Sequence, residues 1–247
     1  MGRLKTIRWG AVALALPLIL WMMSASSIAL EKPIWNGPRS SAKVALTFDD
    51  GPFDPQTSEL LRVLKRYNAK ASFFVVGDSA RKNPQLIRKI VSQGHELANH
   101  TFSHRRLDTL SKKDIRQEIS WTEKVVNEIA SVSMPYFRPP GGRYNREVLE
   151  VATDLGLKTV LWDVNAGDYR QTRVLDMRGN PLKTPVVSQR SSQAILRYVM
   201  KQSKNGSILL FHNIGGETPK ALDALLQSLT SRGIECVTLS TLLERKT

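Results

Sequence analysis

Residues 43–52 read KVALTFDDGP, an apolar run that ends in two carboxylates, a glycine and a proline. The apolar run predicts a buried strand, and Asp, Gly and Pro favour the turn that ends it. Taken alone, the four residues after the strand are more typical of a turn than of a site. Burying the charges of Asp49 and Asp50 without a cation would be costly, however, so the pair also predicts a bound metal ion.

The four histidines of the chain add to this prediction. His100 and His104 lie in the sequence NHTFSH at 99–104, downstream of the acidic pair. Two imidazoles and one carboxylate make a three-ligand set for a divalent ion and leave room for water and substrate. His212 closes an apolar run and is interpreted as a general acid rather than a packed core histidine. His95 begins a strand and is interpreted as structural. The three-ligand set leaves one carboxylate and one further histidine, which could serve as general base and general acid. A metal site with a base and an acid beside it indicates a hydrolase.

Short apolar segments alternate with amphipathic ones from residue 43 onward. The predicted strands are 43–48, 71–75, 96–99, 135–138, 158–162, 207–211 and 234–239. The predicted helices are 60–64 with its flanks, 84–93, 111–129, 146–155, 192–202 and 219–231. This alternation predicts an α/β fold with a parallel sheet, either a barrel or an open doubly wound sheet.

Polar side chains follow five of the predicted strands. They are Asp49 and Asp50, then His100 and His104, then Arg138, Asp168 and His212. Because the loops after the strands of an α/β barrel carry its chemistry, we expect these residues on one rim. Arg138 stands before Pro139-Pro140-Gly141-Gly142, and this rigid corner predicts a fixed guanidinium that pairs with a carboxylate. Residues 164–190 show little periodicity and predict either a substrate-contacting flap or a surface loop; we favour the flap because it begins at the inferred site.

The N-terminal segment predicts export. Residues 9–30 carry no charge and follow three basic residues, which is typical of a signal sequence. A cleaved signal peptide and an uncleaved membrane anchor both remain open, and we favour the anchor for residues 1–30 because the run could span a bilayer. Residues 31–42 are predicted to be a linker, and the domain at 43–247 is expected outside the cytoplasm, anchored or secreted and associated with the cell wall.

The composition limits the partners of this domain. The whole chain carries a formal net charge of +14 and residues 1–30 contribute only three of its cations, so the domain is also basic; this charge favours anionic partners, namely wall polymers, lipid headgroups or nucleic acid. We expect no nucleic acid, because the chain is exported and has no recognisable binding motif for one. The single cysteine, Cys236, excludes an intramolecular disulfide and is expected to be a buried structural thiol.

In combination, TFDDGP at 47–52 and NHTFSH at 99–104 resemble the motifs of the NodB-homology polysaccharide deacetylases, carbohydrate esterase family 4. The resemblance covers residues 43–243. It implies a distorted (β/α)7 barrel that binds zinc or a similar divalent ion and removes acetyl groups from N-acetylated sugars. Export and basic charge favour peptidoglycan as the substrate. The alternatives are a chitooligosaccharide deacetylase and, from another class, a non-catalytic wall-binding module.

The resemblance also implies a role for each matching residue. Asp49 would be the catalytic base, held in place by Arg138. The metal ligands would be Asp50, His100 and His104.

The catalytic acid would be His212, tuned by Asp168, with Leu210 lining a pocket for the acetyl methyl group. Gly141 stands where the family usually has an aromatic residue, and its backbone N–H would still bind the oxyanion. Tyr169 stands where the family usually has tryptophan.

These two departures leave the chemistry intact and alter the aromatic walls of the substrate groove. Tyr144 and Tyr169 are therefore expected to reshape it.

Overall fold

The computed structural model describes residues 30–172, 186–188 and 190–244. Its main sheet has eight strands in the order β5-β4-β3-β2-β1-β9-β6, with β10 also paired to β1. All of these pairings are parallel. The strands are β1 (Lys43–Asp49), β2 (Ser72–Val75), β3 (Glu96–Asn99), β4 (Tyr136–Phe137), β5 (Lys158–Thr159), β6 (Val164–Asn165), β9 (Ile208–His212) and β10 (Glu235–Val237).

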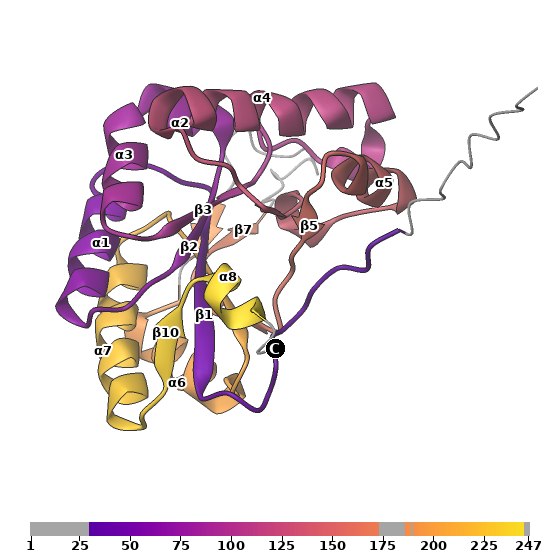
Figure 1. Cartoon of the computed structure of the whole chain (residues 1–247). Coiled ribbons are helices and arrows are strands. Elements are labelled where there is room, and N and C mark those ends of the chain that lie inside the picture. The colour runs from indigo at the N-terminus through magenta and orange to yellow at the C-terminus, as the bar shows by residue number, and fades with distance from the viewer. Residues whose placement is uncertain (1–29, 173–185, 189, 245–247) are drawn as a thin grey trace, which may run out of the picture.

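The α-helices in the described part of the chain are α1 (Gln56–Arg66), α2 (Gly77–Lys82), α3 (Pro84–Ser92), α4 (Lys112–Ala130), α5 (Arg146–Asp154), α6 (Ser192–Gln202), α7 (Glu217–Ser231) and α8 (Leu239–Leu243). Helices α1, α3, α4 and α7 pack against the outer face of the sheet (Figure 1). Ser111 caps α4, at the start of the predicted helix 111–129, since its Oγ accepts a hydrogen bond from the backbone N–H of Asp114. The predicted α/β fold with a parallel sheet is confirmed.

The sheet is curled but not closed by strand pairing between β5 and β6. The segment before β1 crosses this opening: Ile34 forms a parallel bridge with Val160, and Asn36 forms an antiparallel bridge with Ser207. Part of the stretch 31–42, predicted as a linker, therefore pairs with the sheet. The fold is a curled parallel half-barrel with helices, which is the coarser form of the distorted (β/α)7 barrel that the resemblance implied.

Two other predicted segments differ in detail from the structure. The segment 164–190, predicted to be a flap or a surface loop, contains β6 and the antiparallel strands β7 (Arg170–Thr172) and β8 (Val186–Ser188), while its residues 173–185 and 189 lie outside the described part of the chain. These strands have two or three residues each, too few for a visible sequence period. The contact of this segment with a substrate stays a prediction. The predicted strand at 234–239 ends at Val237, and Thr238 caps α8.

Within the described residues, no helix is long and apolar enough to cross a bilayer, and the predicted anchor lies outside them except for Leu30.

Alternation along β1 explains how the sheet carries both a core and a site. Val44, Leu46 and Phe48 pack outward against the helices, whereas Ala45 packs into the interior of the half-barrel. Successive side chains of a strand point to opposite faces, so Asp49 shares the inner face with Ala45. Strand β1 thus packs its apolar side chains against the outer helices and places its last side chain, Asp49, at the inner rim.

Candidate metal and catalytic site

The predicted site residues converge at the carboxyl ends of the strands. Asp49 ends β1, and His212 is its register partner at the end of β9. The other residues lie directly after strands: Asp50 after β1, His100 and His104 after β3, Arg138 after β4 and Asp168 after β6. The expectation of one rim is therefore met, because parallel strands end at the same edge.

Asp50, His100 and His104 form a candidate metal set. Their ligand atoms all lie within 4.8 Å of one another. Asp50 Oδ1 is 3.4 Å from His100 Nε2 and 3.1 Å from His104 Nε2. Tetrahedral zinc with ligands at about 2.1 Å separates its donors by about 3.4 Å, so these distances fit such an ion. The side chain of His104 is 43% accessible, which leaves one side of the set open for water and substrate.

The partner of His100 Nδ1 supports the same assignment. This atom lies 2.8 Å from the carbonyl oxygen of Arg138, to which it can only donate. A neutral His100 then presents the lone pair of Nε2 to the carboxylate of Asp50. Two acceptors facing each other require a proton or a cation between them, and a ligating histidine typically donates its other nitrogen to a carbonyl in this way.

The electrostatics of the set favour a carboxylate opposed by imidazoles. Burial raises the pKa of Asp50, but its interactions with the imidazoles of His100 and His104 outweigh this and hold that pKa well below its usual range. Burial lowers the pKa of His104, but the hydrogen bond and charge of Asp50 raise it above its ordinary value overall. The carboxylate is therefore ionised at neutral pH, as a metal ligand must be.

Arg138 and Asp49 form a buried ion pair beside this set. The guanidinium is fully buried, and its Nη1 donates to Asp49 Oδ1 at 2.6 Å and to Thr47 Oγ1 at 3.0 Å. Nε and Nη2 donate to the carbonyls of Val160 and Leu161 at 3.1 and 3.0 Å. The predicted pairing of Arg138 with a carboxylate is thus present. The other oxygen of Asp49 stays on the side of the metal set, 3.7 Å from His100 Nε2.

Arg138→Met is expected to lower the free energy of unfolding of the metal-free protein by about 3–5 kcal/mol, because it leaves Asp49 buried without its cation. Urea unfolding in the presence of a chelator measures this. The double variant with Asp49→Asn removes both charges and should recover part of the loss. Equal losses in the single and double variants would contradict the ion-pair explanation.

His212 is held by Asp168 in a second pair. Asp168 Oδ2 accepts the backbone N–H of His212 at 2.8 Å, and Oδ1 lies 2.9 Å from His212 Nδ1. Thr218 Oγ1 also donates to Asp168, at 2.8 Å. Burial lowers the pKa of His212, but the hydrogen bond and charge of Asp168 raise it to about 9. His212 is therefore protonated at neutral pH, as a proton donor must be.

The four residues predicted to contact substrate differ in how close they lie to these two ion pairs. The ring centroid of Tyr169 is 5.3 Å from that of His212, which places Tyr169 at the site. Leu210 is buried two positions before His212 on the same face of β9. Gly141 has a φ of 63°, and a Cβ there would meet no atom within 4 Å. Tyr144 is exposed in the loop before α5.

Three residues of the site escaped the sequence predictions. Thr47 accepts a hydrogen bond from Arg138, and Thr218 donates one to Asp168. Thr47 belongs to the TFDDGP stretch, but nothing local to either threonine indicates its partner. Asn213 donates its backbone N–H to the carbonyl of Asp49 at 2.8 Å. Its side chain packs so closely on Gly51 that a Cβ there would lie 2.1 Å from Asn213 Nδ2, which explains the glycine after the acidic pair.

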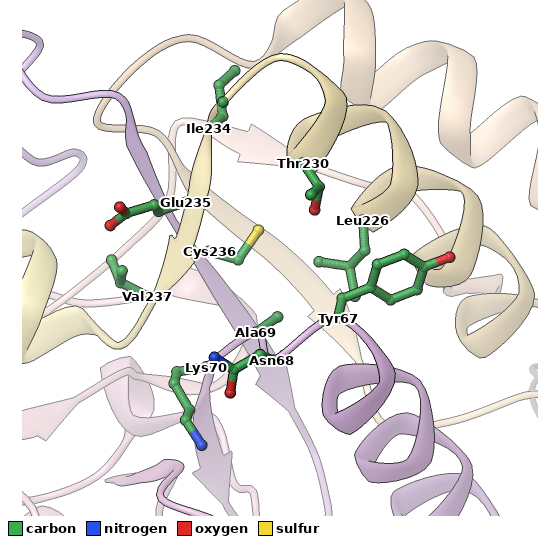
Figure 2. A pocket seen from close by; sticks show the side chains of 11 residues that line it. Tyr67, Asn68, Ala69, Lys70, Leu226, Thr230, Ile234, Glu235, Cys236 and Val237 are labelled. Atoms are coloured by element: carbon green, nitrogen blue, oxygen red, sulfur yellow. The ribbon is translucent and has the colours of Figure 1, made fainter.

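A separate cavity of about 540 Å³ lies near the amino ends of β2 and β10, away from this rim (Figure 2). Its titratable lining residues are Tyr67, Lys70, Glu235 and Cys236. Burial raises the pKa of the Cys236 thiol to about 12, so the thiol is protonated and a poor nucleophile, in line with the predicted structural role. The rim at the carboxyl ends remains the candidate site.

A curled parallel sheet with a three-donor metal set, a paired carboxylate and a paired imidazole on one rim defines a class of hydrolase. Comparison with known proteins specifies the class. The model of the polysaccharide deacetylase family matches residues 36–160. A peptidoglycan-N-acetylglucosamine deacetylase from Bacillus cereus is 33% identical over 215 residues, which span 86% of this chain and 93% of that protein. A chitooligosaccharide deacetylase from Sinorhizobium fredii is 32% identical over 213 residues, which span 79% of this chain and 91% of that protein.

The fold comparison agrees. A carbohydrate esterase family 4 pseudoenzyme from Bacillus anthracis superposes with a TM-score of 0.75 at 26% identity, covering 86% of this chain and 69% of that chain. The chain belongs to the polysaccharide deacetylase family.

Proposed function

We propose that this protein removes N-acetyl groups from the sugars of peptidoglycan and releases acetate. The observation that carries the proposal is the placement of Asp49 and His212 as register partners on adjacent strands, beside the metal set. A carboxylate paired with Arg138 can accept a proton, and an imidazolium paired with Asp168 can donate one. The proton acceptor and the proton donor needed to hydrolyse an amide thus lie on neighbouring strands beside the metal set.

The residues of the metal set fit zinc, and we propose zinc as the ion. A zinc ion held by Asp50, His100 and His104 supplies a Lewis acid that polarises the acetamide carbonyl and makes a water more acidic.

The remaining chemistry falls to the protein. Asp49, oriented by its hydrogen bond from Arg138, takes a proton from the attacking water. The backbone N–H of Gly141 donates to the oxygen that gains negative charge. His212 then protonates the sugar nitrogen, because an amide expels its amine poorly unless the nitrogen is protonated. Leu210, buried on β9 two positions before His212, would contact the acetyl methyl group.

The choice of peptidoglycan rests on three observations. The Bacillus cereus relative is named for this substrate. The N-terminal segment predicts export to the compartment where the wall lies, with residues 1–30 as signal or anchor. The net charge of +14 suits an anionic wall polymer. We propose on the same grounds that the domain works outside the cytoplasm, at the cell wall.

A chitooligosaccharide is the second candidate substrate, because the Sinorhizobium fredii relative is named for it. The full-length protein, zinc-loaded, should release acetate from purified peptidoglycan more rapidly than from N-acetylglucosamine oligomers, and removal of zinc by a chelator should stop the release. Acetate from the oligomers alone would instead support the second candidate. No acetate from either, with zinc bound, would contradict the enzymatic proposal and favour a wall-binding module.

A further inference from the structure

The loop that carries both histidine ligands, residues 100–104, is held in an unfavourable backbone conformation. Thr101 and His104 have φ angles of 68° and 57°, in the left-handed region. Histidine tolerates this region better than most residues, but a β-branched residue such as threonine is a genuine outlier there. Such a conformation is strained and persists only when the surroundings impose it.

Side-chain oxygens impose the conformation by accepting every backbone N–H of residues 101–104. Thr101 donates to Asn99 Oδ1 at 2.9 Å, Phe102 and Ser103 to Glu118 Oε2 at 3.1 and 2.8 Å, and His104 to Thr101 Oγ1 at 3.1 Å. The hydroxyl of Ser103 donates to the other oxygen of Glu118. Glu118 thus accepts three of these hydrogen bonds, more than any other residue.

Glu118 lies on α4, which packs beside the loop but contributes no metal ligand. The buried face of this helix carries Ile115, Glu118, Ile119, Thr122 and Val126. A carboxylate within such a face, only 7% exposed, is costly unless hydrogen bonds satisfy it. The two N–H groups and the hydroxyl of the loop are those partners, and the burial of Glu118 is explained by the loop that it binds.

The neighbouring turn of α4 reinforces the same contact. Asn99, which accepts the N–H of Thr101, donates from Nδ2 to the carbonyl of Ile119 and to Glu123 Oε1, at 2.9 and 2.8 Å. The loop is therefore attached to α4 at two successive turns.

We propose that Glu118 is a positioning residue for the metal site: its carboxylate fixes the loop at Phe102 and Ser103 and so sets the separation of His100 and His104. The proposal rests on the metal site put forward above. Without Glu118, the two N–H groups lose their acceptor and the strained loop can relax, which moves the His104 imidazole away from Asp50. The expected consequence is weaker binding of zinc, because groups that orient metal ligands typically contribute 10- to 100-fold in metal affinity.

The test is the zinc affinity of the full-length protein, measured without glycan by competition with a chromophoric chelator. Glu118→Met keeps the length of the side chain and removes both acceptors, and it should weaken zinc binding about 10- to 100-fold. Glu118→Gln keeps one oxygen for the two N–H groups and can donate to Ser103, so it should recover most of the affinity. Glu128→Met, at an exposed position of the same helix, should bind zinc like the wild type.

The melting temperature of each metal-free variant separates this role from a purely structural one. A lower melting temperature of Glu118→Met with unchanged zinc affinity would overturn the proposal. If Glu118→Met does not fold, Ser103→Ala carries the test: the loss of its hydroxyl should weaken zinc binding about fivefold, and wild-type affinity would overturn the proposal. Wild-type protein that binds zinc but releases no acetate would refute only the proposed reaction, whereas wild-type protein that binds no zinc would overturn this inference.

Discussion

The Asp49→Asn variant is expected to lose about 10²- to 10⁴-fold in the rate of acetate release while it still binds zinc, because it removes the general base and none of the metal ligands. Asparagine keeps an oxygen that can accept from Arg138, so the geometry of the rim should survive. It cannot accept the proton of the attacking water. The measurement is acetate release by wild-type and variant protein at equal zinc content.

The control for this prediction is Asp54→Asn, an exposed aspartate in the same loop. It makes the same chemical change close to the site and should leave the rate within twofold. A rate close to wild type for Asp49→Asn would show that another group takes the proton. Binding of peptidoglycan by Asp49→Asn is expected to persist, so a loss of binding together with the rate would point to a misfolded rim instead.

The location of the candidate site and the fold class could be predicted from sequence because each has a local signal, whereas only the family resemblance assigned Asp50 rather than Asp49 to the candidate metal set. A strand that ends in two carboxylates, and histidines four residues apart, are visible as short patterns of rare residues. The N-cap of α4 at Ser111 is equally local. Parallel topology then follows from the alternation of strands and helices. The convergence on one rim is a consequence of that topology, which is why Asp49 and His212 could be placed together across most of the chain.

The parts that could not be predicted depend on contacts between distant segments. Thr218 is 50 positions from Asp168, and nothing near it in sequence indicates that it donates to that carboxylate. The bridge of Ile34 to Val160 likewise joins a segment that reads as a linker. Glu118 is an intermediate case: a glutamate in the apolar period of an amphipathic helix indicates a buried partner, but the period does not say which one.

The Asp168→Asn variant is expected to move the alkaline limb of the rate profile to lower pH. His212 must be protonated to donate to the sugar nitrogen, and its pKa of about 9 keeps it so at neutral pH. The rate of the wild type should therefore fall only as the pH rises past that value. Burial lowers the pKa of His212 and Asp168 raises it, so neutralising Asp168 should return the pKa to about 6.5 or below. At pH 8 the protonated fraction would then fall about 30-fold.

The quantity to compare is the difference in the pH of the alkaline limb between wild type and Asp168→Asn. A bound divalent ion offsets the charges of Asp49 and Asp50 and so lowers the pKa of His212 in both proteins. Thr218→Val is the matched control, because it removes one hydrogen bond from Asp168 and keeps the carboxylate, so its limb should move by less than about one pH unit. A limb that stays in place in Asp168→Asn would show that His212 is not the titrating acid. If the alkaline limb of Asp168→Asn moves while its rate at low pH equals that of the wild type, Asp168 acts through the proton on His212 rather than through the shape of the site.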